Sequence, residues 1–142
     1  MKKLFLLLLV IPFLYQCSKE NFNNYNPYLP NYQFSITIDM NLPSYSVLKF
    51  PSNAKLILDQ SAGVNGVVVF NTGSGYRAFD SSCPNQELSS CSMLRISGVN
   101  VVCPCDDVQY SLFTGQAMGT QTQYPLKSYR IEQIGDVLRI YN

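Results

Sequence analysis

The sequence predicts an all-β domain, an antiparallel β-sandwich or barrel, that follows an N-terminal export signal and a tether. From Tyr32 onward, apolar and polar residues alternate with a period of two, which is typical of strands that bury one face. Pairs of Gly, Asn, Ser and Asp that favour tight reversals separate these runs at short intervals. No long stretch has helical periodicity, so many short strands must build the domain.

The first segment, residues 1–16, has the features of an export signal. Lys2 and Lys3 precede the apolar run "LFLLLLVIPFL", which is shorter than the ~20 apolar residues of a transmembrane helix. Cys17 follows, with Leu14 three residues before it. This spacing resembles the lipobox of bacterial lipoproteins, which implies cleavage before Cys17 and a diacylglycerol on its sulfur. The alternative is an ordinary secretory signal with a cysteine nearby.

Residues 17–31 are rich in Asn, Tyr and Pro and lack apolar periodicity. We therefore expect a lipid-anchored cysteine and a flexible tether here, followed by one β domain over residues 32–142. The start of this segment, "CSKEN", resembles the signals that send some lipoproteins to the outer face of the outer membrane. These resemblances imply a protein held at the outer membrane by its lipid, facing either the periplasm or the outside.

The first predicted strand, "YQFSITIDM" (32–40), places its aromatic and aliphatic residues on one face and its polar residues on the other. Gly135-Asp136 joins the last two apolar-alternating runs through two residues, which is a strong hairpin signal. The other predicted strands cover residues 46–50, 54–59, 66–70, 76–80, 92–96, 100–103, 108–112, 128–134 and 137–141.

The charge balance excludes a nucleic-acid-binding protein. Loss of Lys2 and Lys3 with the signal leaves eight basic and nine acidic side chains, and these form no basic run. Phosphate recognition requires clustered Lys and Arg. The chain also contains no histidine, so it has no Ser-His or Cys-His pair, and we assign no catalytic residue.

Four cysteines lie in two short segments of the predicted domain. The segments "GVVVFNTGSGYRAFDSSCPN" (66–85), "VVCPCDDVQYSLFTGQAMG" (101–119) and "YPLKSYRIEQIGDVLRIYN" (124–142) carry a resemblance to the Rieske iron–sulfur domain. It covers about residues 45–142. It implies a Rieske-like antiparallel β fold with an inserted tip of two loops, which in the family hold a [2Fe–2S] cluster.

In the Rieske family each cluster loop supplies one cysteine and one histidine, as C-x-H and C-x-x-H. This chain keeps both cysteines, Cys83 and Cys103, but has Asn85 and Asp106 at the histidine positions. A side-chain amide is a poor ligand to iron, so the resemblance implies a domain that has lost its cluster and carries no cofactor. The alternative is an electron-transfer protein whose atypical [2Fe–2S] cluster is held by Cys83, Cys103, Asp106 and Asn85.

Without a cluster, the four cysteines are expected to form disulfides, which persist in an exported protein. Some Rieske proteins have a disulfide between their loops, and Cys91 and Cys105 match its positions. Cys83 and Cys103 correspond to ligands of one iron, so their sulfurs would already lie close together. Four cysteines allow three connectivities, and the resemblance supplies a preference among them.

Two functions thus remain in addition to electron transfer. The favoured one is a disulfide-stabilised structural or interaction module whose exposed tip, residues 83–91 and 103–107, contacts a protein partner. The other is a thiol–disulfide redox site at Cys103-Pro104-Cys105. That function ranks last, because no Lys, Arg or His lies nearby in sequence to stabilise a thiolate.

Overall fold

The computed structural model describes residues 24–142, which form two antiparallel sheets, one of six strands and one of four. The predicted all-β class is confirmed. The predicted signal peptide and Cys17 lie outside the described residues. Within the described part, no helix is long and apolar enough to cross a membrane.

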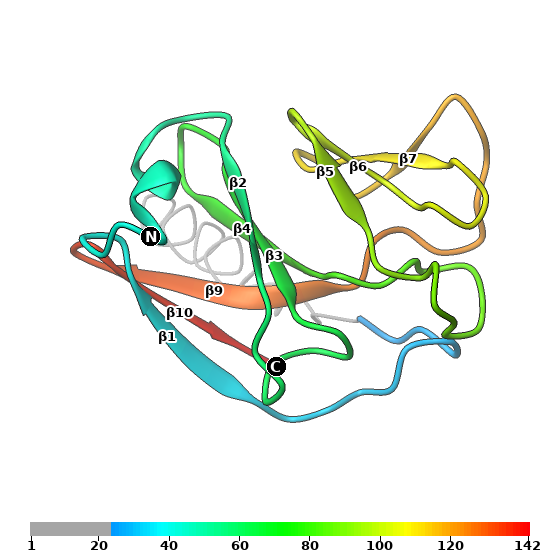
Figure 1. The fold of residues 1–142 in the computed structure, drawn as a ribbon, viewed down its shortest axis with the longest axis horizontal. Helices are drawn as coiled ribbons and strands as arrows, with labels where there is room; N and C mark the ends of the chain where they lie inside the picture. The colour runs from blue at the N-terminus through cyan, green and yellow to red at the C-terminus, as the bar shows by residue number, and fades with distance from the viewer. Residues whose placement is uncertain (1–23) are drawn as a thin grey trace, which may run out of the picture.

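The larger sheet has the strand order β1-β10-β9-β4-β3-β2. The predicted hairpin at Gly135 is confirmed: Ile134 pairs with Val137, and Gly135 has a positive φ of 62° that suits the tight turn. Figure 1 shows this sheet curling, so that β1 and β10 lie across from β2 and β3. Its strands are β1 (Ser35–Asp39), β2 (Ala54–Ile57), β3 (Val67–Asn71), β4 (Tyr76–Asp80), β9 (Ser128–Ile134) and β10 (Val137–Tyr141).

The smaller sheet has the order β5-β6-β7-β8 and comes from the chain between β4 and β9. In Figure 1 it stands beside the curled sheet as a separate layer in yellow-green and yellow. Its strands are β5 (Arg95–Ser97), β6 (Asn100–Val102), β7 (Gln109–Ser111) and β8 (Ala117–Met118). This insertion carries the two cysteine-bearing loops.

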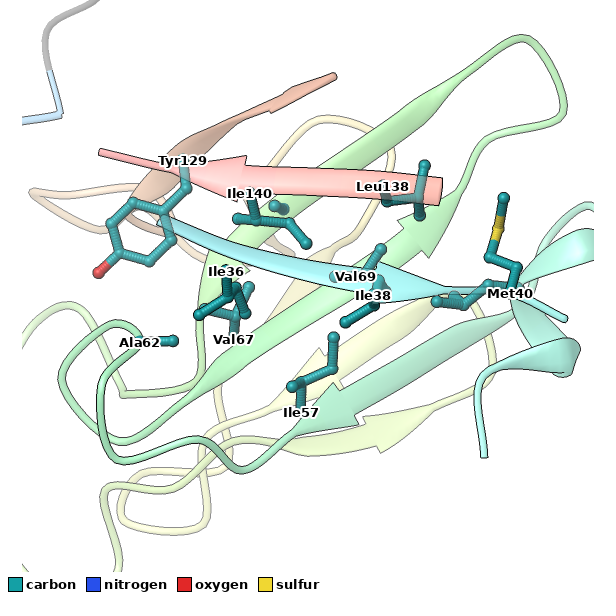
Figure 2. Close-up of a cluster of buried hydrophobic side chains, with 12 residues drawn as sticks. Ile36, Ile38, Met40, Ile57, Ala62, Val67, Val69, Tyr129, Leu138 and Ile140 are labelled. Carbon is teal, nitrogen blue, oxygen red and sulfur yellow. The ribbon is translucent and has the colours of Figure 1, made fainter. Parts of the chain in front are cut away.

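Strand β3 separates two cores, which explains its continuous apolar sequence. Val67 and Val69 face the inside of the curled sheet, where Figure 2 shows aliphatic side chains of β1 and β10 opposite those of β2 and β3. Val68 and Phe70 face the smaller sheet. The second core comprises Val68, Phe70, Phe79, Cys83, Leu94, Val101, Cys103, Tyr110, Leu112 and Leu126. Two of the four cysteines are therefore core residues.

Two elements differ from the sequence expectation. Residues 46–50 do not form a strand; Ser46–Lys49 form a 3-10 helix that buries Leu48 completely. The Asn71 side chain donates a 2.7 Å hydrogen bond to the Leu48 carbonyl, so the turn is fixed by a contact distant in sequence. The short strand β8 was not expected, because two residues are too few to show a period.

Residues 24–31, here called the strap, also differ from the expected tether. Leu29 is 1% exposed and Asn26 is 6% exposed, so the strap packs on the domain. Its polar side chains find partners there: Asn26 donates to the Pro84 carbonyl at 2.8 Å, and Asn24 donates to the Ser128 carbonyl at 3.2 Å. Such contacts involve residues far along the chain, and no local pattern reports them.

Lys127 contacts both ends of the strap. Its side chain is buried, and its ammonium group donates to the Asn24 carbonyl at 3.0 Å and to Asn31 Oδ1 at 3.2 Å. Burial lowers the pKa of Lys127, while the carboxylate of Asp80 opposes this effect. A buried cation with oxygen acceptors on the strap therefore holds that segment in place.

We expect Lys127→Met to release the strap while the two sheets stay folded. The variant keeps the apolar stem but loses both hydrogen bonds, which should lower the free energy of unfolding by about 1–2 kcal/mol. Limited proteolysis should then cut within residues 24–31 before any other site. Lys55→Met, on the partly exposed strand β2, serves as the control and should leave the cleavage pattern unchanged. Equal resistance of both variants to proteolysis would contradict the role of Lys127.

Candidate functional site

The tip is formed by two loops that lie together at the right of Figure 1, beside the smaller sheet. The first loop connects β4 to β5, and the second connects β6 to β7. Backbone hydrogen bonds close each loop: Cys83 N–H donates to the Ser92 carbonyl at 2.7 Å, and Cys103 N–H donates to the Val108 carbonyl at 2.9 Å. Both cysteines therefore lie where a loop leaves its sheet.

Asp80 fixes the start of the first loop from the interior. It is the last residue of β4, is fully buried, and its carboxylate accepts three hydrogen bonds. The donors are the backbone N–H of Val64 at 2.6 Å, the backbone N–H of Ser82 at 2.8 Å and the Tyr129 hydroxyl at 2.7 Å. Burial and this carboxylate raise the pKa of Tyr129 far above its usual range, so the hydroxyl remains a donor.

The four cysteines of the tip form two disulfides. Cys83 is bonded to Cys103 and Cys91 to Cys105, with Cα–Cα distances of 5.5 Å and 5.2 Å, within the usual range. These are the pairs that the resemblance implies. Each bond joins the first loop to the second.

The two disulfides have different surroundings. Cys83 is 1% exposed and Cys103 is 0% exposed, among the side chains of the second core. Cys91 and Cys105 are partly exposed, and the Ser89 hydroxyl lies 3.2 Å from Cys91 Sγ and 3.7 Å from Cys105 Sγ. One bridge thus belongs to the core, whereas the other reaches the surface.

Asn85, which the sequence resemblance aligns with a ligand histidine, links three parts of the domain through its side chain. Its side-chain amide donates to the Tyr110 hydroxyl at 3.0 Å and to the Tyr124 carbonyl at 2.7 Å. Its Oδ1 accepts from the Tyr124 backbone N–H at 2.8 Å. The side chain therefore joins the first loop to β7 and to the segment before β9, and its polar atoms face these partners.

Asp106, which the same resemblance aligns with the other histidine, stabilises a local turn. Its Oδ1 accepts from the Val108 backbone N–H at 3.1 Å, two residues on, and the residue is exposed. Such a bond is typical of an Asx-turn. It lies in the same loop as Asp107, which has a positive φ of 57°.

The donor set does not fit a two-cysteine, two-histidine cluster. Among the described residues, the sulfurs of Cys83, Cys103 and Cys105 lie within 4.8 Å of one another, and this group does not include Asp106. Of the ligands that the electron-transfer alternative requires, this group contains Cys83 and Cys103. Two of the three sulfurs are also bonded to each other.

An open groove runs along the tip next to the exposed disulfide. Its volume is about 610 Å³, and Cys91 and Pro104 form part of its wall. Exposed apolar side chains line it with one cation, Arg95 of β5. The other lining residues are Leu56, Ser90, Met93, Leu94 and Ile96. Sequence reasoning missed Arg95 as a groove residue, because the groove forms only where Leu56 of β2 and Pro104 of the second loop meet the segment from Ser90 to Ile96.

Comparison with solved structures identifies the architecture. A complex of reduced oxygenase and oxidized ferredoxin in carbazole 1,9a-dioxygenase contains a chain that aligns with 78% of this protein and 94% of its own length, with a TM-score of 0.51 and 15% identity. The chain has a Rieske-like fold. The predicted recognition is thereby confirmed at the level of the fold.

A second Rieske-like neighbour is a larger protein. The terminal oxygenase of carbazole 1,9a-dioxygenase from Novosphingobium sp. KA1 aligns over 80% of this chain and 30% of its own, with a TM-score of 0.50 and 12% identity. This chain therefore corresponds to less than a third of that oxygenase. No family profile and no curated protein matches the sequence.

We expect Asn85→Ala to destabilise the protein by about 1–3 kcal/mol, because it leaves the Tyr124 backbone groups without their partner. Chemical denaturation would measure this loss. Asn53→Ala is a matched control, since its amide bonds only the nearby carbonyls of Phe50 and Pro51. If Asn85→Ala were as stable as the parent protein, or if it lost a visible absorption band of an iron–sulfur cluster, the structural role of Asn85 would be contradicted.

Proposed function

We propose that this protein is an exported, lipid-anchored Rieske-like domain without an iron–sulfur cluster, which serves as a disulfide-stabilised interaction module. One observation carries the proposal: the Asn85 side chain, at a ligand position, is committed to three hydrogen bonds within the protein. A side chain held in this way joins the first loop to Tyr110 and Tyr124 and is already engaged within the protein.

The sulfur chemistry supports the same function. Cys83 and Cys103 each have one sulfur, and both are used in the buried disulfide. Cluster ligation needs both sulfurs as thiolates. In an oxidising compartment the disulfide is the favoured state of two adjacent thiols.

The tip offers a surface for a protein partner. Three exposed apolar residues, Leu88, Met93 and Ile96, lie in the first loop and β5, and Met93 and Ile96 line the same groove. Their exposed fractions are 45%, 39% and 37%. Apolar side chains gathered on one surface are typical of contact sites. A complex between an oxygenase and a ferredoxin is known for a protein of this fold, which supports protein contact as the use of the fold.

The proposed anchor is the lipid on Cys17, at the outer membrane. Its support is the sequence before Cys17. Asn24, the first described residue of the strap, lies seven residues after Cys17. An extended chain covers at most about 3.3–3.6 Å per residue, so seven residues reach roughly 25 Å. Because the strap is bonded to Pro84 of the first loop, the tip would be held close to the membrane surface.

Electron transfer through an all-sulfur cluster is the second candidate. It is favoured by the convergence of Cys83, Cys103 and Cys105 within 4.8 Å, with Cys91 bonded to Cys105. This candidate requires all four cysteines to be reduced.

Intact mass after alkylation under denaturing conditions, without reductant, tests the proposal on the exported chain carrying Cys17→Ser. We expect no alkylated cysteine, no iron and no sulfide. Four alkylated cysteines together with iron and sulfide would overturn the proposal in favour of the all-sulfur cluster. Two alkylated cysteines with iron would indicate a cluster beside one disulfide.

A further inference from the structure

We propose that Cys91–Cys105 is a thiol–disulfide exchange site for cysteine-bearing polypeptides, and that Cys105 passes the exchange on to the buried Cys83–Cys103 bond. This activity deepens the proposed interaction module and rests on it, because the four sulfurs must be free of iron. The structure provides three separate supports: access to one disulfide, contact between the two disulfides, and a groove for the partner.

The outer disulfide is accessible to an attacking sulfur. Cys91 lines the groove and is partly exposed, so a partner thiolate lying there can approach Cys91 Sγ. The Ser89 hydroxyl, 3.2 Å from Cys91 Sγ and 3.7 Å from Cys105 Sγ, can donate to whichever sulfur leaves as a thiolate. Arg95 lines the same groove and attracts an anionic sulfur.

The reaction is a two-electron exchange with a partner dithiol. A partner thiolate attacks Cys91 Sγ, which forms a mixed disulfide, breaks the Cys91–Cys105 bond and releases Cys105 as a thiolate. The second partner thiol, after losing its proton, attacks the partner sulfur of the mixed disulfide, and Cys91 leaves. The partner is oxidised to a disulfide, and Cys91 and Cys105 are reduced to thiols.

The released Cys105 lies within reach of the buried bond. Its Sγ lies within 4.8 Å of the Sγ atoms of both Cys83 and Cys103. Attack on Cys83 forms a Cys83–Cys105 bond and releases Cys103 as a thiolate, with no net change in oxidation. This choice keeps the two loops joined, whereas attack on Cys103 would bridge residues of one loop only. Solvent-excluded sulfurs thereby become coupled to the surface pair.

The groove favours a polypeptide over a small acidic thiol. Leu56, Met93 and Ile96 offer apolar walls along about 610 Å³, and Arg95 is the one cation among the lining residues of the described chain. Pockets of this size bind chiefly through apolar contact with a few polar groups for orientation. An extended segment with an apolar side chain beside its cysteine matches this lining.

The test uses the oxidised exported chain carrying Cys17→Ser. It is mixed with one equivalent of a reduced C-x-x-C peptide flanked by Leu and Val, or of the same peptide flanked by Asp and Glu. Alkylation at successive times followed by peptide mapping locates the new thiols. We expect label first on Cys91 and Cys105 and then on Cys103, with the apolar peptide reacting at least about tenfold faster.

Two variants show whether the outer pair is the route. In Cys91→Ser/Cys105→Ser, the buried bond should be reduced at least about tenfold more slowly than in the parent, because its sulfurs are inaccessible. Ser89→Ala should slow reduction several-fold, while Ser44→Ala, at an exposed serine outside the groove, should not. Far-UV circular dichroism and a thermal melt confirm that each variant is folded.

The outcomes separate this inference from the proposed function. Iron in the parent protein would overturn both. If the protein is iron-free and folded but the peptides reduce its two disulfides at equal rates, the exchange site would be overturned. The proposed interaction module would remain. Equal reduction of the buried bond with and without the outer pair would overturn the relay through Cys105. Equal rates with both peptides would overturn the polypeptide as the preferred partner.

Discussion

Asp80→Ala is expected to lower the free energy of unfolding by about 3–5 kcal/mol, one of the largest effects of a single substitution in this protein. The carboxylate is fully buried and accepts hydrogen bonds from Val64 N–H, Ser82 N–H and the Tyr129 hydroxyl. Alanine leaves all three donors without this acceptor, and the donors on Ser82 and Tyr129 are buried. Urea denaturation monitored by circular dichroism would measure the shift in midpoint.

Asp59→Ala is the matched control for this variant. Asp59 also accepts a backbone N–H, from Ser61, at 2.8 Å, but the carboxylate is exposed and water can replace it. Its midpoint should stay within experimental error. Tyr129→Phe should give an intermediate loss, because it removes one of the three donors and keeps the ring in the core. Equal midpoints for the Asp80 and Asp59 variants would contradict the network.

Loss of Asp80 should also affect the tip. Its Oδ1 orients Ser82, the residue before Cys83, so the first loop begins from a fixed backbone position. A looser start would expose the buried disulfide to reductant. We therefore expect faster reduction of Cys83–Cys103 in Asp80→Ala at urea concentrations where the protein is still folded.

Strands with a buried face could be predicted from the sequence with accurate bounds. The predicted ranges 76–80, 128–134 and 137–141 coincide with β4, β9 and β10. In these segments a period of two agrees with turn residues on both sides, so local preference and packing favour the same structure. The prediction fails at 46–50, where Val47 and Leu48 are adjacent and a distant partner, Asn71, fixes a helical turn.

The strap shows a second limit of sequence reasoning. Its composition is that of a linker, yet its amides bond to Pro84 and Ser128, about 60 and 100 residues away in the chain. Polar residues of this kind pack only when the fold presents matching groups. No pattern of apolar and polar residues within the strap indicates these distant hydrogen-bond partners.

The candidate site also has features that the sequence could predict and features that it could not. The cysteines could be paired by resemblance, since the spacing of the two loops is written in the sequence. The role of Asn85 could not, because it depends on Tyr110 and Tyr124, which only the fold brings to it. The groove that Arg95 and Cys91 both line likewise depends on the fold, because Leu56 and Pro104 come to it from distant parts of the chain. This placement weakens the sequence-based objection to thiol chemistry at the tip.

Removal of the two disulfides should have unequal effects. In Cys83→Ala/Cys103→Ala we expect a loss of about 4–5 kcal/mol, and in Cys91→Ala/Cys105→Ala a loss of about 2–3 kcal/mol. The sequence separations, 20 and 14 residues, give similar loop entropies of about 3 kcal/mol each. The buried pair adds the cost of a cavity in the second core, where both sulfurs are packed.

The outer pair contributes less for a further reason. Its loop overlaps the loop already closed by Cys83 and Cys103, so its entropy term is partly shared. Urea denaturation of both double variants would measure the difference in their free energies of unfolding. The comparison requires that this free energy depends on urea concentration with the same slope in both variants. Equal losses would contradict the division into a core bridge and a surface bridge. The predicted order also meets a requirement of the exchange site, because the outer bond must open while one disulfide still joins the two loops.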